Sequence, residues 1–117
     1  MADKVEDLSK VEYASLLYDF YGSLLNENQS EVMELYHEDN LSLSEIAEQL
    51  GTTRQAVHYT LKKAEKALSG YEAKLGLVEF YKTRQRLTAR LAELIDQSNL
   101  GIADKDEAAV LLEALAE

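Results

Sequence analysis

Apolar side chains recur every three or four residues along most of this 117-residue chain, the spacing that places them on one face of an α-helix. Short polar segments separate these stretches. The pattern predicts five or six helices, which cover approximately residues 9–25, 26–38, 43–50, 54–75, 77–97 and 104–117. We therefore expect an all-α fold, in which two helices joined by a tight turn are followed by a long helix.

Four local signals predict where helices begin. A Ser, Asn or Asp side chain can accept a hydrogen bond from the free N–H groups of a first helical turn, and a Glu or Gln three residues later completes a capping box. The pairs with this spacing are Ser9–Glu12, Asn26–Gln29, Ser42–Glu45 and Asp104–Glu107. The segment 98–101, Ser-Asn-Leu-Gly, is the expected break before the last helix.

The apolar residues at helical spacing are the expected core. In the first two helices they are Tyr13, Leu16, Leu17, Phe20, Leu24, Val32, Met33, Leu35 and Tyr36. The long helix 77–97 has an apolar seam made of Phe80, Leu87, Leu91, Leu94 and Ile95. This seam could close the core by folding back on the first helix or form a two-fold interface with a second copy, and we favour a homodimer.

The segment Leu43 to Lys63, LSEIAEQLGTTRQAVHYTLKK, has the layout of a helix-turn-helix. Gly51 follows the apolar face of the first helix, where the left-handed backbone conformation that ends a helix costs least for glycine. Thr53 can cap the second helix through its hydroxyl group. In DNA-binding members of this motif the second helix lies in the major groove.

The outward face of that second helix carries side chains suited to nucleic acid. Arginine pairs with guanine, glutamine with adenine and lysine with phosphate. The candidate nucleic-acid-binding residues are Thr53, Arg54, Gln55, His58, Tyr59, Lys62, Lys63 and Lys66. The alternative is a helix-turn-helix that serves only as a scaffold, since amphipathic helix pairs joined at a glycine are common in all-α proteins.

Charge is segregated along the chain, which has a formal net charge of −10. Residues 54–90 hold nine basic and three acidic side chains, whereas residues 1–53 hold two and twelve, and residues 91–117 hold one and seven. Any contact with a polyanion should therefore lie within residues 54–90. DNA-binding domains are usually basic, so the acidic flanks predict a modest affinity or the need for a partner. The alternative is that residues 54–90 bind no polyanion and form only a solvated face that complements the acidic helices.

Composition narrows the functional classes. The chain has no cysteine, so disulfides and thiolate metal sites are excluded. It also has no proline. Its two histidines, His37 and His58, fall on different expected helices, and no phosphate-binding glycine loop or nucleophile elbow is present. We expect no enzyme activity, no metal and no cofactor. Without a membrane span or the basic start of a signal peptide, the sequence predicts a cytoplasmic protein.

Two families resemble this chain. The run LLNENQSEVMELYHEDNLSLSEIAEQLGTTRQAVHYTLKKAEKAL, which contains residues 26–63, is similar to region 4 of bacterial sigma factors. Three pieces resemble more closely the YlxM-type helix-turn-helix proteins of Gram-positive bacteria: LLYDFYGSLL at 16–25, ELYHEDNLSLSEIAEQLG at 34–51 and RQAVHYTLKKAEKALSGYEAKLGL at 54–77. That resemblance covers residues 11–97, and we expect residues 1–97 to form one helical domain that contains the helix-turn-helix at 43–63. Residues 98–117 lie outside it and form an acidic C-terminal tail or helix.

The resemblance implies a regulatory role in the signal recognition particle pathway of protein targeting. It also implies nucleic-acid binding, with DNA favoured over RNA because the A-form major groove is too narrow for side chains to enter. The alternative is a protein–protein adaptor for the targeting GTPase or its receptor, in which the helix-turn-helix is scaffold and the acidic helices contact the partner. The segment differs from a complete sigma factor, because it has no equivalent of sigma region 2.

Overall fold

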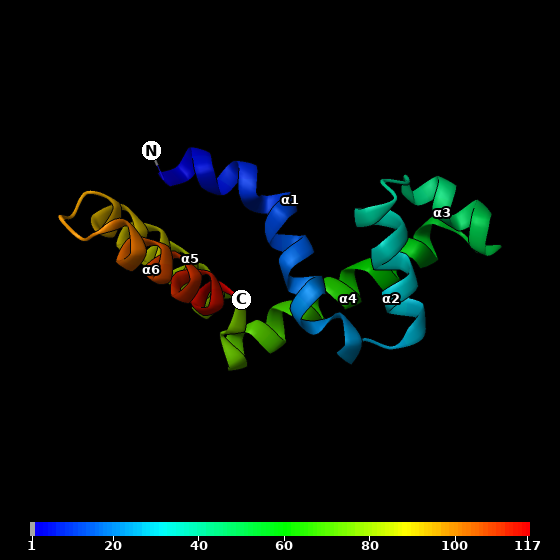
Figure 1. Ribbon diagram of the computed structural model, residues 1–117. Coiled ribbons are helices and arrows are strands. Elements are labelled where there is room, and N and C mark those ends of the chain that lie inside the picture. The colour runs from blue at the N-terminus through cyan, green and yellow to red at the C-terminus, as the bar shows by residue number, and fades with distance from the viewer. Residues whose placement is uncertain (1) are drawn as a thin grey trace. The chain divides into compact units, whose positions relative to one another are not determined.

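The computed structural model describes the backbone of residues 2–117 and the side chains from Lys10 onward. These residues form six α-helices and no strand, which confirms the all-α prediction (Figure 1). The helices are α1 (Ala2–Tyr21), α2 (Glu27–Met33), α3 (Leu43–Leu50), α4 (Arg54–Leu75), α5 (Leu77–Asp96) and α6 (Ile102–Ala116). A short 3₁₀ turn, η1 (Gly22–Leu24), follows α1, and a π-helical turn, η2 (Glu34–Glu38), continues α2.

The chain divides into two compact units, residues 1–76 and 77–117. The first contains α1 to α4, and the second contains α5 and α6. The sequence predicts a different division, in which residues 1–97 form one domain and residues 98–117 a tail. The assignment of residues 1–97 to one domain and of residues 98–117 to a tail stays a prediction.

The core of the first unit lies along one side of α4. Helices α1, α2 and α3 all pack against this helix. The residues that α4 buries recur at helical spacing, and they are Val57, Leu61, Ala64 and Leu68. Facing them, the covering elements bury Leu17, Tyr21, Val32, Met33, Leu35, Ile46 and Ala47. Tyr13, Leu24 and Tyr36, which the sequence places in this core, are exposed instead.

Local chemistry explains how the short helices begin. The Asn26 side chain accepts a hydrogen bond from the Gln29 backbone N–H (2.8 Å), and the Gln29 side chain accepts one from the Asn26 N–H (3.3 Å). Ser42 and Glu45 make the equivalent reciprocal pair at the start of α3, with distances of 3.1 and 2.8 Å. Both predicted capping boxes are therefore confirmed.

Two of the predicted helix starts are wrong. Helix α1 begins at Ala2, so Ser9 lies within it rather than before it. Helix α6 begins at Ile102 with Gly101 at the cap and no side-chain cap, so Asp104 lies in the first turn. A capping pair is only a local preference, and strong helix formers upstream of it can extend the helix past that point.

The turn between α3 and α4 has the predicted geometry. Gly51 adopts the left-handed conformation, with φ +69° and ψ 39°. The Thr52 backbone N–H then donates to the Ala47 carbonyl (2.9 Å), and Thr53 caps α4 by accepting from the Ala56 N–H (3.0 Å). These bonds satisfy the free backbone groups where the chain changes direction, and they orient the start of α4 relative to α3.

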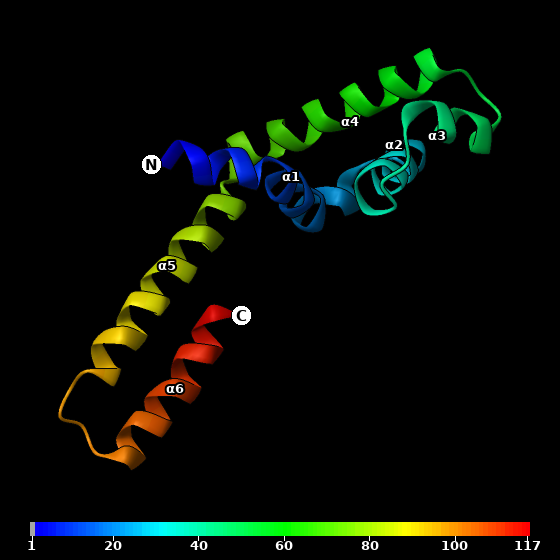
Figure 2. The same cartoon turned by 90° about the horizontal axis from the view of Figure 1, so that it is seen from above.

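The second unit is a helical hairpin. Helices α5 and α6 run antiparallel and lie side by side in both views, joined by the segment 97–101 (Figure 2). The end of α6 is held on α5 by two side chains, because Arg84 donates to the Glu117 carbonyl oxygen (3.0 Å) and Gln85 to the Ala116 carbonyl oxygen (2.9 Å). At the other end, the Lys105 ammonium donates to the Asp96 carbonyl oxygen (2.8 Å).

Two of the open glycines of the first unit make a matched test of backbone conformation. A Cβ at Gly51 or Gly70 would meet nothing within 4 Å, so only the backbone differs between them. We expect Gly51→Ala to lower the free energy of unfolding by about 1 kcal/mol, because its φ is left-handed. Gly70→Ala, within α4, should raise it by roughly 0.5–1 kcal/mol. Urea unfolding followed by circular dichroism measures both, and shifts of the same sign would contradict this account.

Candidate nucleic-acid interface

The surface of α4 that faces away from the core contains all the candidate residues. Their side chains are exposed without exception, and they are Thr53, Arg54, Gln55, His58, Tyr59, Lys62, Lys63 and Lys66. None of these eight side chains is buried against the core. The structure therefore brings the predicted set together on one helix, along its first four turns.

Four of these residues form the centre of the surface. Gln55, Tyr59, Lys62 and Lys66 follow one another at intervals of four, three and four residues, which places them in one row along the helix. This row lies opposite the buried stripe that begins at Val57. Their side chains therefore project furthest from the folded body of the unit.

The remaining candidates flank this row. The Lys63 ammonium lies 5.5 Å from the centroid of the Tyr59 ring, an arrangement that holds the two side chains beside each other. Arg54 and His58 lie on the opposite side of the row from Lys63. The Thr53 hydroxyl accepts the capping hydrogen bond, which leaves its own hydrogen free to donate to a phosphate oxygen.

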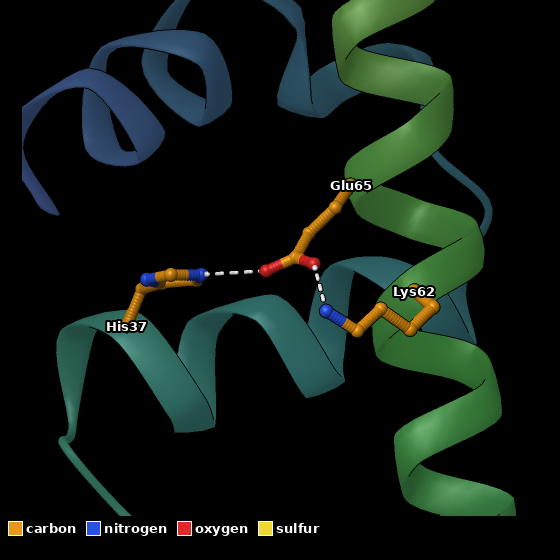
Figure 3. Close-up of polar contacts among 3 residues, drawn as sticks. All are labelled: His37, Lys62 and Glu65. Atoms are coloured by element: carbon orange, nitrogen blue, oxygen red, sulfur yellow. Dashed lines mark ion pairs between the residues drawn. The ribbon is translucent and has the colours of Figure 1, made fainter. Parts of the chain in front are cut away.

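One of the two carboxylates of α4 is directed towards η2. Glu65 lies between His37 and Lys62, with its two carboxylate oxygens 3.6 Å from His37 Nε2 and Lys62 Nζ respectively (Figure 3). Both distances are too long for good hydrogen bonds. The contact with Lys62 is an ion pair, and the contact with His37 is one only when the imidazole is protonated. The His37 side chain is 13% exposed, whereas that of Lys62 is 65% exposed. Lys62 therefore remains accessible even while it pairs with Glu65.

The other carboxylate of α4 is bound by α1. The hydroxyl of Tyr21, whose side chain is fully buried, donates to Glu72 Oε1 at 2.6 Å. The Tyr21 and Tyr71 rings also pack together, with centroids 6.0 Å apart. These contacts fasten the second half of α4 to α1 and keep the Glu72 carboxylate on the inner side.

The result is a separation of charge across α4. Its five basic residues are all exposed, and they are Arg54, Lys62, Lys63, Lys66 and Lys74. Its two acidic residues, Glu65 and Glu72, are only half-exposed and are directed towards the elements that cover the helix. The row opposite the core thus contains Lys62 and Lys66 and no carboxylate, although Glu65 lies 3.6 Å from Lys62 and the chain as a whole is acidic.

Sequence reasoning missed the residues that create this separation. His37 and Tyr21 lie far from Glu65 and Glu72 in the chain, so no local pattern indicates that they meet. The only visible signal is the spacing of the two carboxylates, which are seven residues apart and so share one side of the helix. Among the described residues there is no group of His, Asp or Glu side chains that could hold a metal ion.

A family model described as "Putative helix-turn-helix protein, YlxM / p13 like" matches residues 8–108. The chain belongs to this family, UPF0122. The resemblance to YlxM-type proteins is therefore confirmed. Its description is that of a helix-turn-helix family. Within the described part of the chain, no helix is both long enough and apolar enough to cross a membrane.

Several relatives in the family align with most of this chain. A UPF0122 protein of Desulforamulus reducens is 49% identical over 89 residues, which cover 76% of each chain. One from Symbiobacterium thermophilum is 41% identical over 107 residues, covering 92% of this chain and all of the relative. One from Bacillus cereus is 46% identical over 90 residues, covering 77% of this chain and 82% of the relative.

The hydrogen bond between Tyr21 and Glu72 should contribute to stability. Replacing Tyr21 with phenylalanine keeps the buried ring but removes the donor to a carboxylate, so we expect the free energy of unfolding to fall by about 1–2 kcal/mol. Tyr59→Phe is the matched control, since Tyr59 is 64% exposed and its change should stay within about 0.5 kcal/mol. Denaturant titration measures both, and equal values would show that the Tyr21 hydroxyl contributes nothing.

Proposed function

We propose that this protein is a regulatory protein that binds duplex DNA through the outward face of α4. The observation that supports this proposal is the charge separation across that helix. Both carboxylates are turned inward, while five cations and a row of polar side chains are exposed. A solvated structural helix has no need for such an arrangement, whereas a helix that meets phosphates does, because phosphate neutralisation supplies much of the affinity.

The proposed roles follow the position of each residue along α4. In helix-turn-helix proteins the first turns of the second helix contact base edges. Arg54, Gln55, His58 and Tyr59 occupy those turns, and their side chains can contact guanine, adenine or the thymine methyl group. Further along, the three lysines Lys62, Lys63 and Lys66 would contact phosphates, as would the Thr53 hydroxyl at the N-terminus of the helix.

Duplex DNA suits this surface better than duplex RNA. The candidate residues lie on a continuous helix whose 22 residues extend about 33 Å at 1.5 Å per residue. The B-form major groove admits an α-helix, whereas the A-form groove is too narrow and deep for its side chains. A single-stranded RNA loop could still stack on the exposed Tyr59 ring, and direct competition between the two polymers distinguishes these ligands.

The surroundings of α4 predict weak, salt-sensitive binding. Acidic side chains are exposed on the neighbouring helices, among them Glu27, Glu31, Glu34 and Glu48. Their field opposes the approach of a polyanion from any direction other than the outward face of α4. Binding should therefore depend on orientation as well as charge, and it should fall steeply as salt screens the few favourable contacts.

The family resemblance supports a further proposal about pathway. We place the protein in the signal recognition particle pathway, as a cytoplasmic regulator without cofactor. A second candidate function is a protein–protein adaptor for the targeting GTPase or its receptor. The exposed acidic row Glu27, Glu31 and Glu34 on α2 and η2 favours it, because this row would suit a basic partner surface. In that case α4 would act as scaffold.

A salt titration tests the DNA proposal. With Lys62, Lys63 and Lys66 on phosphates, the slope of log K against log salt should be about −2.7 for duplex DNA. The triple variant Lys62→Ala, Lys63→Ala, Lys66→Ala should bring the slope close to zero and weaken binding at every salt concentration. Fluorescence anisotropy with labelled duplex DNA measures both quantities.

The control is Lys74→Ala, which removes one exposed cation from the far end of the same helix. It should leave the slope within about 0.5 of the wild-type value, because it lies beyond the proposed contacts. A triple variant that binds like the wild type would refute the role of α4. Absence of binding to DNA or RNA at low salt would favour the adaptor function instead.

Sequence preference tests the base-contacting residues separately. Replacing Arg54 and Gln55 with alanine should lower affinity for a selected duplex by about 1–3 kcal/mol per lost bidentate contact. Affinity for random duplex should change far less, because the lysines remain. Selection from a randomised duplex library, with wild type and variant in parallel, measures the preference. If both proteins select the same sequence equally well, these two residues do not contact bases.

A further inference from the structure

The hairpin of α5 and α6 leaves an apolar face uncovered. On α5 it is made by Phe80, Leu87, Leu91 and Leu94, which are 63%, 58%, 44% and 48% exposed. On α6 it continues through Leu111 and Leu115, which are 58% and 56% exposed. We call these six residues the hairpin face. Soluble chains scatter single apolar residues over their surface, but a contiguous patch indicates a binding site.

The two helices contribute to the same side of the hairpin. Leu115 of α6 and Phe80, Leu87 and Leu91 of α5 line a single groove of about 280 Å³. A second groove between the two helices is lined by a different set of residues, among them Ile95 and Leu112, which are half-buried. Each helix therefore has two apolar sides, one half-buried beside its neighbour in the hairpin and one more exposed. That is the arrangement of a helix at the corner of a four-helix bundle, where it must contact two neighbours.

The spacing of the residues identifies the kind of partner. Phe80, Leu87 and Leu94 are seven residues apart, and Leu91 lies four residues after Leu87 and three before Leu94. This heptad spacing places side chains on the seam by which one helix packs along another. Arg84 occupies the remaining seam position, with its guanidinium 5.4 Å from the centroid of the Phe80 ring. The missing neighbour is therefore expected to be helical.

Charge favours a second copy of the same hairpin. Helix α5 carries four basic and three acidic side chains, whereas α6 carries one basic and four acidic. A two-fold axis parallel to the helices places α5 of each copy over α6 of the other, so the more basic helix meets the more acidic one. Placing α5 over α5 would instead bring the four cations of each copy together. The hairpin is thus complementary to itself in one of these two arrangements.

The exposed area is sufficient for a dimer. Six large apolar side chains, each about half exposed, amount to roughly 450 Å² per copy. A stable interface buries about 800 Å² per partner, of which somewhat more than half is apolar. The hairpin face would therefore supply the apolar centre of such an interface, and the charged residues beside it would supply the rim.

From these observations we propose that the protein forms a homodimer through the hairpin face, by completing an antiparallel four-helix bundle with α5 of each copy over α6 of the other. This proposal does not depend on DNA binding. A dimer also carries two copies of α4, so nucleic-acid affinity would gain from bivalency when both copies contact one duplex.

Light scattering coupled to gel filtration tests the dimer. The wild type should show twice the 13.2 kDa mass of the chain. Leu91→Glu places a carboxylate in the seam and should give the monomer mass, whereas Leu91→Met should remain a dimer. Ala89→Glu adds the same carboxylate to an exposed position outside the hairpin face and should also remain a dimer. Circular dichroism should show equal helix content in all four proteins.

A wild type that stays monomeric at several hundred micromolar would overturn the proposal. So would a Leu91→Glu variant that keeps the dimer mass, which would place the interface elsewhere. If the wild type is monomeric and Leu91→Glu lowers its free energy of unfolding, another part of the same chain covers the hairpin face. If Leu91→Glu loses the dimer and still binds a single DNA site as the wild type does, dimerisation through the hairpin face and DNA binding by α4 are independent properties.

Cross-linking tests the arrangement of the helices, and the absence of cysteine from the chain makes the background clean. Leu87→Cys and Leu115→Cys are made as separate proteins, mixed and oxidised. With α5 over α6, the mixture should form disulfide-linked dimers more efficiently than either protein alone, because identical positions are diagonal in the bundle. Efficient linkage of Leu87→Cys to itself would overturn this arrangement in favour of α5 over α5.

Discussion

The packing of one side of α4 against three other helices determines the rest of the first unit. Its stripe of Val57, Leu61, Ala64 and Leu68 is almost completely buried, and α1, α2 and α3 all contact this helix. Without that stripe the short helices α2 and α3 would have no common surface, and helices of their length are not stable alone in water. Because one side of α4 is fully used in this way, the opposite side must face solvent.

The same packing decides where charge can accumulate. The elements that cover α4 supply groups for both of its carboxylates, the Tyr21 hydroxyl for Glu72 and the His37 ring for Glu65. Negative charge on this helix is consequently drawn towards the core side. A strongly acidic chain can then present exposed lysines and polar side chains on one helix face, although its total charge predicts the opposite. Total charge is therefore a poor guide to partners when charge is segregated by packing.

The sequence was sufficient for features that depend on neighbouring residues. The capping boxes at Asn26 and Ser42, the Thr53 cap and the left-handed Gly51 each involve groups within a few residues of one another. Local patterns failed where the outcome depends on longer stretches. The Ser9 pair has the right spacing, yet α1 continues through it because residues before Ser9 also favour helix. Contacts such as Tyr21 with Glu72, 51 residues apart, leave no local pattern to recognise.

The two long helices differ in what their free sides can do. The exposed row of α4 consists of polar and basic side chains, which lose little by facing water. The exposed seam of α5 is apolar, and a hairpin of two helices has only one internal interface in which to bury such residues. A unit of residues 77–117 is near the lower limit of size at which a chain can build a core without help. The proposed dimer would bury this heptad pattern, because it supplies the third and fourth helices of a bundle.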